Sequence, residues 1–170
     1  MKHFYFIVTF VFLFSCCKNG QTIKDNDNNQ IPADFYFEIH FGRPKSNLNT
    51  DNFNTKNSLF QRGYSNGDTS IRINLTAQET QKIYLSFFTN DFLKLPEEVD
   101  QDTFLNKGID MTDISLFSNG QLKKVRCFNY EILPQTNELD RFENVKKTIL
   151  GIITSKQNYK SLKPSDLIGI

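Results

Sequence analysis

Polar and apolar residues alternate in three stretches of the first half of the chain, which is the pattern of half-buried β-strands. The alternation is clearest over residues 35–41, where His40 is one of the polar residues between apolar neighbours. A weaker stretch covers residues 59–64, and a third covers residues 71–75 after a turn. The sequence therefore predicts three strands, each with one apolar face, and an Asn-rich loop over residues 45–57.

Two other stretches have the period of an amphipathic helix. Thr76 followed by Glu79 is a capping box, in which each side chain satisfies a backbone N–H at a helix start. This first helix is expected to end near Asn90, and a second helix is expected over residues 137–156. One stripe of each helix is expected to face the sheet. The stripes are Thr80, Ile83, Tyr84, Phe87 and Phe88 in the first helix and Leu139, Phe142, Val145, Ile149, Ile152 and Ile153 in the second.

A β-hairpin is predicted between the two helices. Residues 111–118 and 121–130 are rich in β-prone side chains, and Asn119 and Gly120 separate them. This pair is the preferred sequence of a two-residue type I′ turn, because both positions need a positive φ. The two stretches are therefore expected to pair as antiparallel strands.

The order of these elements predicts an α+β fold, with an antiparallel sheet of about five strands and two amphipathic helices packed on one face. Residues 33–170 are expected to form a single globular domain, since no repeat or second boundary interrupts them. The tail, residues 159–170, is expected to fold back over this domain.

The N-terminal residues have the composition of a secretory signal peptide. Lys2 precedes an apolar run over residues 4–14, and the small residue Ser15 follows it. Such a run spans roughly 17 Å as a helix, whereas the hydrocarbon core of a membrane is about 30 Å thick. Residues 1–15 are therefore expected to be removed, and the polar residues 16–32 are expected to form a flexible tether.

Leu13, Phe14, Ser15 and Cys16 resemble the lipobox of bacterial lipoproteins, a family in which the cysteine is lipidated and becomes the mature N-terminus. Phe14 stands where most members of the family have a small residue. The resemblance implies acyl chains on Cys16 and a domain anchored outside the cytoplasm in the bacterial cell envelope. No acidic cluster follows Cys16 directly, which favours the periplasmic face. Two alternatives remain, namely an ordinary signal peptide before a chance cysteine pair and a very short membrane anchor.

A second resemblance covers most of the chain after the tether. It rests on Leu75, Thr76, Glu79, Lys82, Ile83, Tyr84, Asp91, Phe92, Leu93, Leu95, Pro96, Ser155, Lys156, Tyr159, Lys160 and Leu162. These residues are similar to those of a group of small bacterial lipoproteins of uncharacterised activity. The resemblance implies capped helices and apolar anchors, and it implies no particular chemistry.

Charge and motifs narrow the classes of function. The chain has 20 Lys and Arg against 19 Asp and Glu, and removal of Lys2 balances the two. A neutral chain has no general electrostatic footprint for nucleic acid, so no nucleic-acid partner is expected. No glycine-rich nucleotide loop, HExxH or GxSxG motif occurs. With His40 as the one mature histidine, neither a metal site nor a cofactor is expected.

Few side chains remain as candidates for chemistry. Cys127 lies among apolar residues and is expected to be a buried small side chain that does not pair with Cys17. The alternative is a nucleophilic dyad of Cys127 with His40. The acidic residues 97–102 are interpreted as a solvated loop. A basic group is interpreted as a charged strand edge that discourages further pairing, and it comprises Lys123, Lys124 and Arg126.

The leading hypothesis from the sequence is a non-enzymatic, lipid-anchored module that binds or positions a partner near a membrane. The membrane is held through acyl chains on Cys16, and the partner is expected to be an envelope protein or a glycan. The alternative is a small extracytoplasmic hydrolase or transferase with an unrecognised site, for which Glu38, His40 and Cys127 are the candidate residues. A purely structural surface protein is a third possibility.

Overall fold

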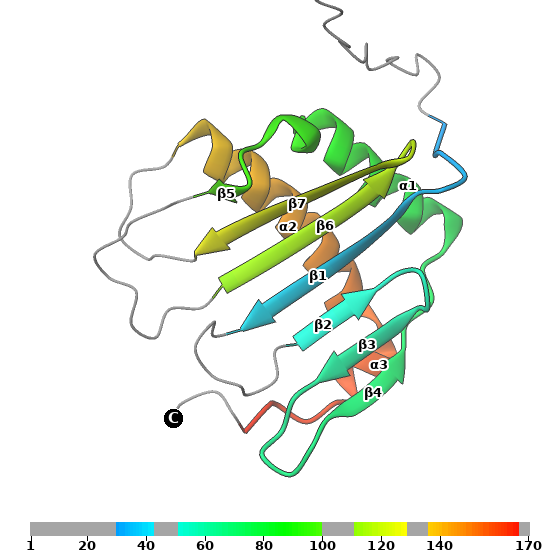
Figure 1. Ribbon diagram of the computed structural model, residues 1–170. Coiled ribbons are helices and arrows are strands. Elements are labelled where there is room, and N and C mark those ends of the chain that lie inside the picture. The colour runs from blue at the N-terminus through cyan, green and yellow to red at the C-terminus, as the bar shows by residue number, and fades with distance from the viewer. Residues whose placement is uncertain (1–29, 43–50, 100–110, 129–135, 167–170) are drawn as a thin grey trace, which may run out of the picture.

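The computed structural model describes residues 30–42, 51–99, 111–128 and 136–166. In this part of the chain, seven strands form one mixed sheet (Figure 1). The strands lie in the order β4-β3-β2-β1-β6-β7-β5. Each is antiparallel to its neighbours except β5, which runs parallel to β7. The strands are β1 (Tyr36–Gly42), β2 (Asp51–Asn54), β3 (Leu59–Arg62), β4 (Thr69–Arg72), β5 (Glu98–Val99), β6 (Met111–Ser118) and β7 (Gln121–Phe128).

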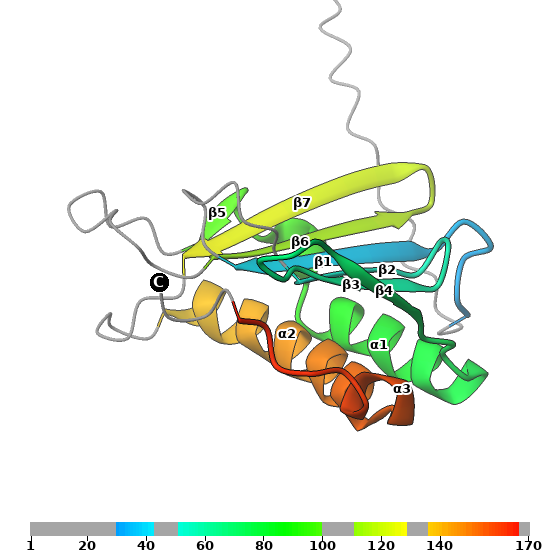
Figure 2. The same cartoon turned by 90° about the horizontal axis from the view of Figure 1, so that it is seen from below.

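The helices of the described residues all lie on one face of the sheet (Figure 2). The predicted α+β fold with helices on one face is thus confirmed. The predicted sheet of about five antiparallel strands differs from the observed one, which has seven strands in its described part and one parallel pair. The helices are α1 (Ala77–Thr89), the short 3-10 helix η1 (Phe92–Lys94), α2 (Asn137–Ser155) and α3 (Gln157–Lys160).

Two strands lie where the sequence pattern indicated loops. β2 falls inside the predicted Asn-rich loop, because Phe53 is its one apolar residue and no alternation is visible in four residues. Phe53 pairs with Ile39 of β1 and with Phe60 of β3, so neighbouring strands define β2. β5 lies in the acidic stretch and is only two residues long, with Val99 buried.

The core lies between the sheet and the two long helices. The predicted stripe of α2 is confirmed, since all its members are buried except Leu139, which is partly buried against the core. The stripe of α1 is confirmed only in part. Ile83 and Phe87 are buried, but Phe88 is 49% exposed and lies outside the core. Phe88 lies about 100° further round the helix than Phe87, so the face of α1 that is covered is narrower than the predicted stripe.

The predicted helix cap and the predicted turn are both confirmed. The Thr76 hydroxyl accepts a hydrogen bond from the Glu79 N–H at 3.2 Å, and the Glu79 carboxylate accepts one from the Thr76 N–H at 2.7 Å. At the hairpin turn, Asn119 has a φ of 52° and Gly120 a φ of 73°. Both features depend on residues close together in the chain, and local sequence was sufficient to predict them.

Candidate functional site: the open face of the sheet

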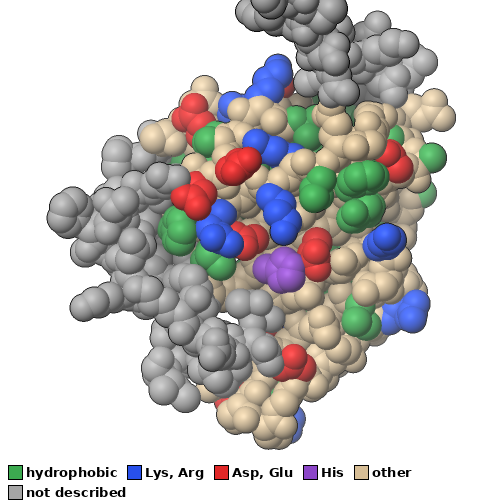
Figure 3. Space-filling model, viewed as in Figure 1, with side chains coloured by type: hydrophobic (Ala, Val, Ile, Leu, Met, Phe, Trp, Pro, Cys, Tyr) green, Lys and Arg blue, Asp and Glu red, His purple; other side chains and the backbone are tan. Residues whose placement is uncertain are grey.

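Side chains on the face of the sheet away from the helices form rows across the strands. Because successive residues of a strand point to opposite faces, the residues between core positions all lie on this face. The strand register then places Glu38 beside Ser115 and Ser115 beside Lys124. Figure 3 shows this face, with acidic and basic side chains gathered around the histidine over the middle of the sheet. We call this surface the open face.

The most strongly connected row crosses four neighbouring strands. His40 of β1 lies opposite Asp113 of β6, which lies opposite Arg126 of β7, which in turn lies opposite Glu98 of β5. The Arg126 guanidinium donates two hydrogen bonds to Asp113, from Nε at 2.8 Å and from Nη2 at 3.0 Å. This bidentate pair raises the pKa of Arg126, and the charge of Glu98 acts in the same direction. Both charges are therefore held in fixed positions.

His40 forms a second polar pair on the same face. Its Nε2 lies 3.1 Å from Oε1 of Glu38, two residues earlier on β1. Both side chains are partly exposed, so they remain accessible to a bound molecule. The imidazole thus contacts the Glu38 carboxylate on its own strand, and the strand register places His40 opposite Asp113 of the next strand.

A shallow hollow of about 670 Å³ lies over these rows. Its walls carry charges of both signs from four strands, so it suits a polar molecule better than an apolar one. The side chains that define its chemistry are His40, Glu98, Asp113, Ser115, Lys124 and Arg126.

The structure separates the residues of the predicted nucleophilic dyad. His40 and Glu38 lie on the open face, whereas Cys127 lies on the opposite, helix-covered face and is 0% exposed. The prediction that Cys127 is a buried small side chain is confirmed. A dyad of Cys127 with His40 is not formed, because the sheet itself lies between the two side chains. Cys16 and Cys17 lie outside the described residues.

Two other interpretations of the charged residues need correction. Glu98 is exposed to solvent as predicted, but it lies in strand β5 and not in a loop, and its backbone pairs with that of Arg126. Arg126 is not at the edge of the sheet, since β6 and β5 flank it and its N–H donates to the Glu97 carbonyl at 2.8 Å. The remainder of the acidic stretch, residues 100–102, lies outside the described residues.

Asp113 is the one member of the connected row that sequence reasoning missed. The signal was present in the hairpin. A two-residue turn at Asn119 and Gly120 fixes the register of its strands, so the residue six positions before Asn119 lies opposite the residue six positions after Gly120. Counting in this way pairs Asp113 with Arg126.

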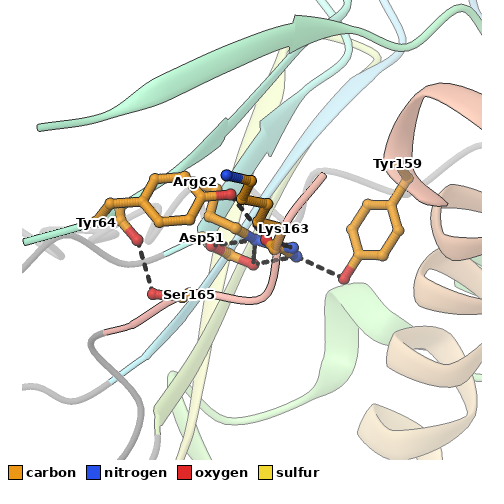
Figure 4. Close-up of polar contacts among 7 residues, drawn as sticks. Asp51, Arg62, Tyr64, Tyr159, Lys163 and Ser165 are labelled. Carbon is orange, nitrogen blue, oxygen red and sulfur yellow. Dashed lines mark hydrogen bonds and ion pairs between the residues drawn. The ribbon is translucent and has the colours of Figure 1, made fainter. Parts of the chain in front are cut away.

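A second polar cluster joins the C-terminal segment to the sheet (Figure 4). Arg62, 7% exposed, donates to both carboxylate oxygens of Asp51, to the Lys163 carbonyl at 3.1 Å and to the Tyr159 hydroxyl at 2.8 Å. Its guanidinium carbon also lies 4.9 Å from the centre of the Tyr159 ring. Burial raises the pKa of Asp51, against the hydrogen bond and charge of Arg62.

This cluster has a structural role. The donor groups of Arg62 are engaged with protein acceptors, and its guanidinium lies against both the Phe60 and the Tyr159 ring, which leaves little access for a ligand. Nearby, the Tyr64 hydroxyl donates to the Lys163 carbonyl at 2.7 Å, and the Ser165 hydroxyl donates to the Gly63 carbonyl at 2.7 Å. The prediction that the tail folds back over the domain is confirmed as far as the described residues extend.

Within the described ranges, no group of three or more His, Cys, Asp or Glu side chains is arranged to hold a metal ion. In the same part of the chain, no helix has the length and apolar character needed to cross a bilayer. In comparisons with known proteins, the chain matches no family model and no curated protein.

Proposed function

We propose that the protein is a lipid-anchored, extracytoplasmic module of the bacterial cell envelope, which binds an envelope protein on the open face of its sheet and catalyses no reaction. The observation that supports binding is the hollow over the connected row, in which paired charges are held in place yet remain partly exposed. The anchor is proposed from the lipobox-like residues that end at Cys16. A preorganised polar surface of this kind favours specific recognition, because its side chains lose little freedom on binding.

The charges of the hollow favour a protein partner over a neutral glycan. Arg126 and Lys124 supply positive charge there, and Asp113 and Glu98 supply negative charge. A neutral molecule that covers these charges removes their water and offers no opposite charge in its place, which costs free energy. A protein segment that carries both signs can match the pattern and gain specificity from it.

The position of Cys127 supports a binding role over the hydrolase or transferase alternative. The candidate site of that alternative combined Glu38, His40 and Cys127, and the sheet keeps Cys127 away from the other two. The His40 and Glu38 pair then acts as a polar contact for the partner.

Site-specific cross-linking tests the proposed binding face. A photoreactive amino acid at Lys124, exposed on the open face, is expected to capture a defined envelope protein in intact cells. The same amino acid at Lys147, exposed on α2, is the matched control and is expected to capture none. High salt is expected to weaken the cross-link at Lys124, because the contacts are between partly exposed charges. Equal labelling at both positions, or none at Lys124, would contradict the proposed face.

Replacement of Cys16 tests the proposed anchor. The Cys16→Ala variant is expected to incorporate no palmitate and to leave the membrane fraction, because the acyl chains supply the stable attachment. Cys17→Ala is the control, and it is expected to keep both the label and the membrane association. Membrane-bound, palmitate-labelled Cys16→Ala protein would show that the anchor is elsewhere.

A further inference from the structure

A row of apolar side chains crosses the open face at one end of the sheet. The register places Tyr36 of β1 beside Phe117 of β6 and Phe117 beside Leu122 of β7. The Tyr36 and Phe117 rings are stacked, with centres 5.0 Å apart and planes at 20°. Leu122 is 60% exposed, so together with the stacked rings it presents a contiguous apolar area to solvent.

The apolar surface continues around the end of the sheet. A hollow of about 500 Å³ adjoins Tyr36 and Phe117 there, and its apolar lining includes Phe35, Phe37, Phe53 and Leu75. Exposed Lys56 lies at its rim, with Nζ 5.4 Å from the centre of the Tyr36 ring. In a bilayer, a leucine side chain favours the acyl layer, a tyrosine favours the interface, and a lysine reaches the lipid phosphates.

The proposed lipid tether joins the domain at this same end. The Asp34 carboxylate accepts hydrogen bonds from the N–H groups of Asn119 at 2.9 Å and Gly120 at 2.7 Å, so the start of the domain is held at the tip of the β6–β7 hairpin (Figure 1). These bonds lower the pKa of Asp34. They also stabilise the negative charge of this side chain, which lines the hollow. Leu122 lies two residues beyond Gly120.

The length of the tether places the apolar row near the lipid. Thirteen residues lie between Cys16 and Gln30, the first described residue. A flexible chain of this length has an end-to-end distance of about 20 Å, so acyl chains at Cys16 would hold this end of the sheet at high effective concentration next to the headgroups. A weak surface affinity is then sufficient for docking.

We infer that the anchored domain docks on the phospholipid surface through Tyr36, Phe117 and Leu122, with Lys56 beside the lipid phosphates. This inference rests on the proposed lipid anchor. His40 lies four positions after Tyr36 on the same face of β1, about 13 Å away, and Leu122 also lines the polar hollow, so docking holds that hollow close to the headgroups. The domain thus presents its binding face to partners that lie in or on the same membrane.

Depth measurements on the full-length lipidated protein test this inference. An environment-sensitive fluorophore is attached to Leu122→Cys in a Cys17→Ser background, and the protein is reconstituted into vesicles of phosphatidylcholine and phosphatidylglycerol. Its emission is expected to shift to the blue and to be quenched by brominated lipids. The same label on Lys147→Cys, on the outer side of α2, is expected to show neither effect. Lys56→Glu is expected to reduce quenching at position 122 while flotation with the vesicles is retained.

Flotation and quenching separate the two levels of the proposal. If the protein floats with the vesicles but the label at position 122 is not quenched, the docking proposal is overturned and the anchor proposal stands. Loss of flotation would overturn both. If the label is buried in native membranes but not in pure lipid vesicles, the apolar row binds a membrane protein. That result would also overturn docking on lipid.

Discussion

Replacing Arg62 by methionine is expected to lower the free energy of unfolding by about 3–5 kcal/mol, because it leaves the Asp51 carboxylate buried without its partner. The substitution also removes the donors to the Tyr159 hydroxyl and the Lys163 carbonyl, so the C-terminal segment loses part of its attachment. Urea unfolding followed by circular dichroism measures the change. Arg126→Met removes a more exposed ion pair, and it is expected to cost about 1 kcal/mol or less.

The loss caused by Arg62→Met is expected to depend on pH. Burial already raises the pKa of Asp51 in the native protein, and removal of Arg62 takes away the hydrogen bond and charge that oppose this effect. The pKa of Asp51 in the folded variant then lies further above its unfolded value. The folded state therefore favours the protonated carboxyl, and the penalty is fully present above the raised pKa.

The penalty should shrink as the pH falls through this raised pKa toward the ordinary carboxyl value of about 3.9. The double variant Asp51→Leu with Arg62→Met removes both charges, and it is expected to be more stable than Arg62→Met alone at neutral pH. A loss from Arg62→Met that stays the same from neutral to acid pH, with no recovery in the double variant, would show that the unpaired Asp51 carboxylate is not its cause.

Alanine at Phe87 is expected to cost about 3–5 kcal/mol, whereas alanine at the neighbouring Phe88 is expected to cost less than about 1 kcal/mol. Phe87 is 3% exposed, and its ring centre lies 4.9 Å from that of Phe92 and 5.8 Å from that of Phe37. Its removal leaves a cavity among aromatic rings. About half of Phe88 is exposed to solvent, and it lies outside the core.

The pair is a matched comparison, because both substitutions remove the same atoms from adjacent positions of α1 and change helix propensity equally. Chemical denaturation of the two variants measures the difference. Equal losses would mean that Phe88 packs against the core as the helical stripe in the sequence predicted, and that the observed orientation of α1 is wrong.

Strand β2 shows why part of the sheet could not be predicted. Its residues are polar except for Phe53, so no local period distinguishes it from a loop. Its position depends on contacts with distant residues. The Thr55 N–H donates to the Phe37 carbonyl at 3.1 Å, and the Thr55 hydroxyl accepts from the Phe37 N–H at 2.9 Å. These bonds and the burial of Phe53 form only when β2 lies between β1 and β3 in the sheet.

The candidate site was predictable only within the hairpin. The turn at Asn119 and Gly120 implies that Asp113 faces Arg126, because the register of a two-residue hairpin follows from its turn. His40 belongs to a strand more than seventy residues earlier in the chain. Its place beside Asp113 follows from the pairing of β1 with β6, and no local feature of either strand specifies that partner.

By itself, the sequence determined the capped start of α1, the stripe of α2, the turn of the hairpin and the location of the helices on one face. The first three depend on residues close together in the chain, where propensity and hydrophobic period act directly, and the fourth follows from the order of the elements. Only the tertiary structure decided the order of the strands, the parallel pairing of β5, the exposure of Phe88 and the separation of Cys127 from His40. The physical reason is that a period of two tells which residues of a strand share a face, whereas backbone pairing and total apolar burial select the neighbouring strand.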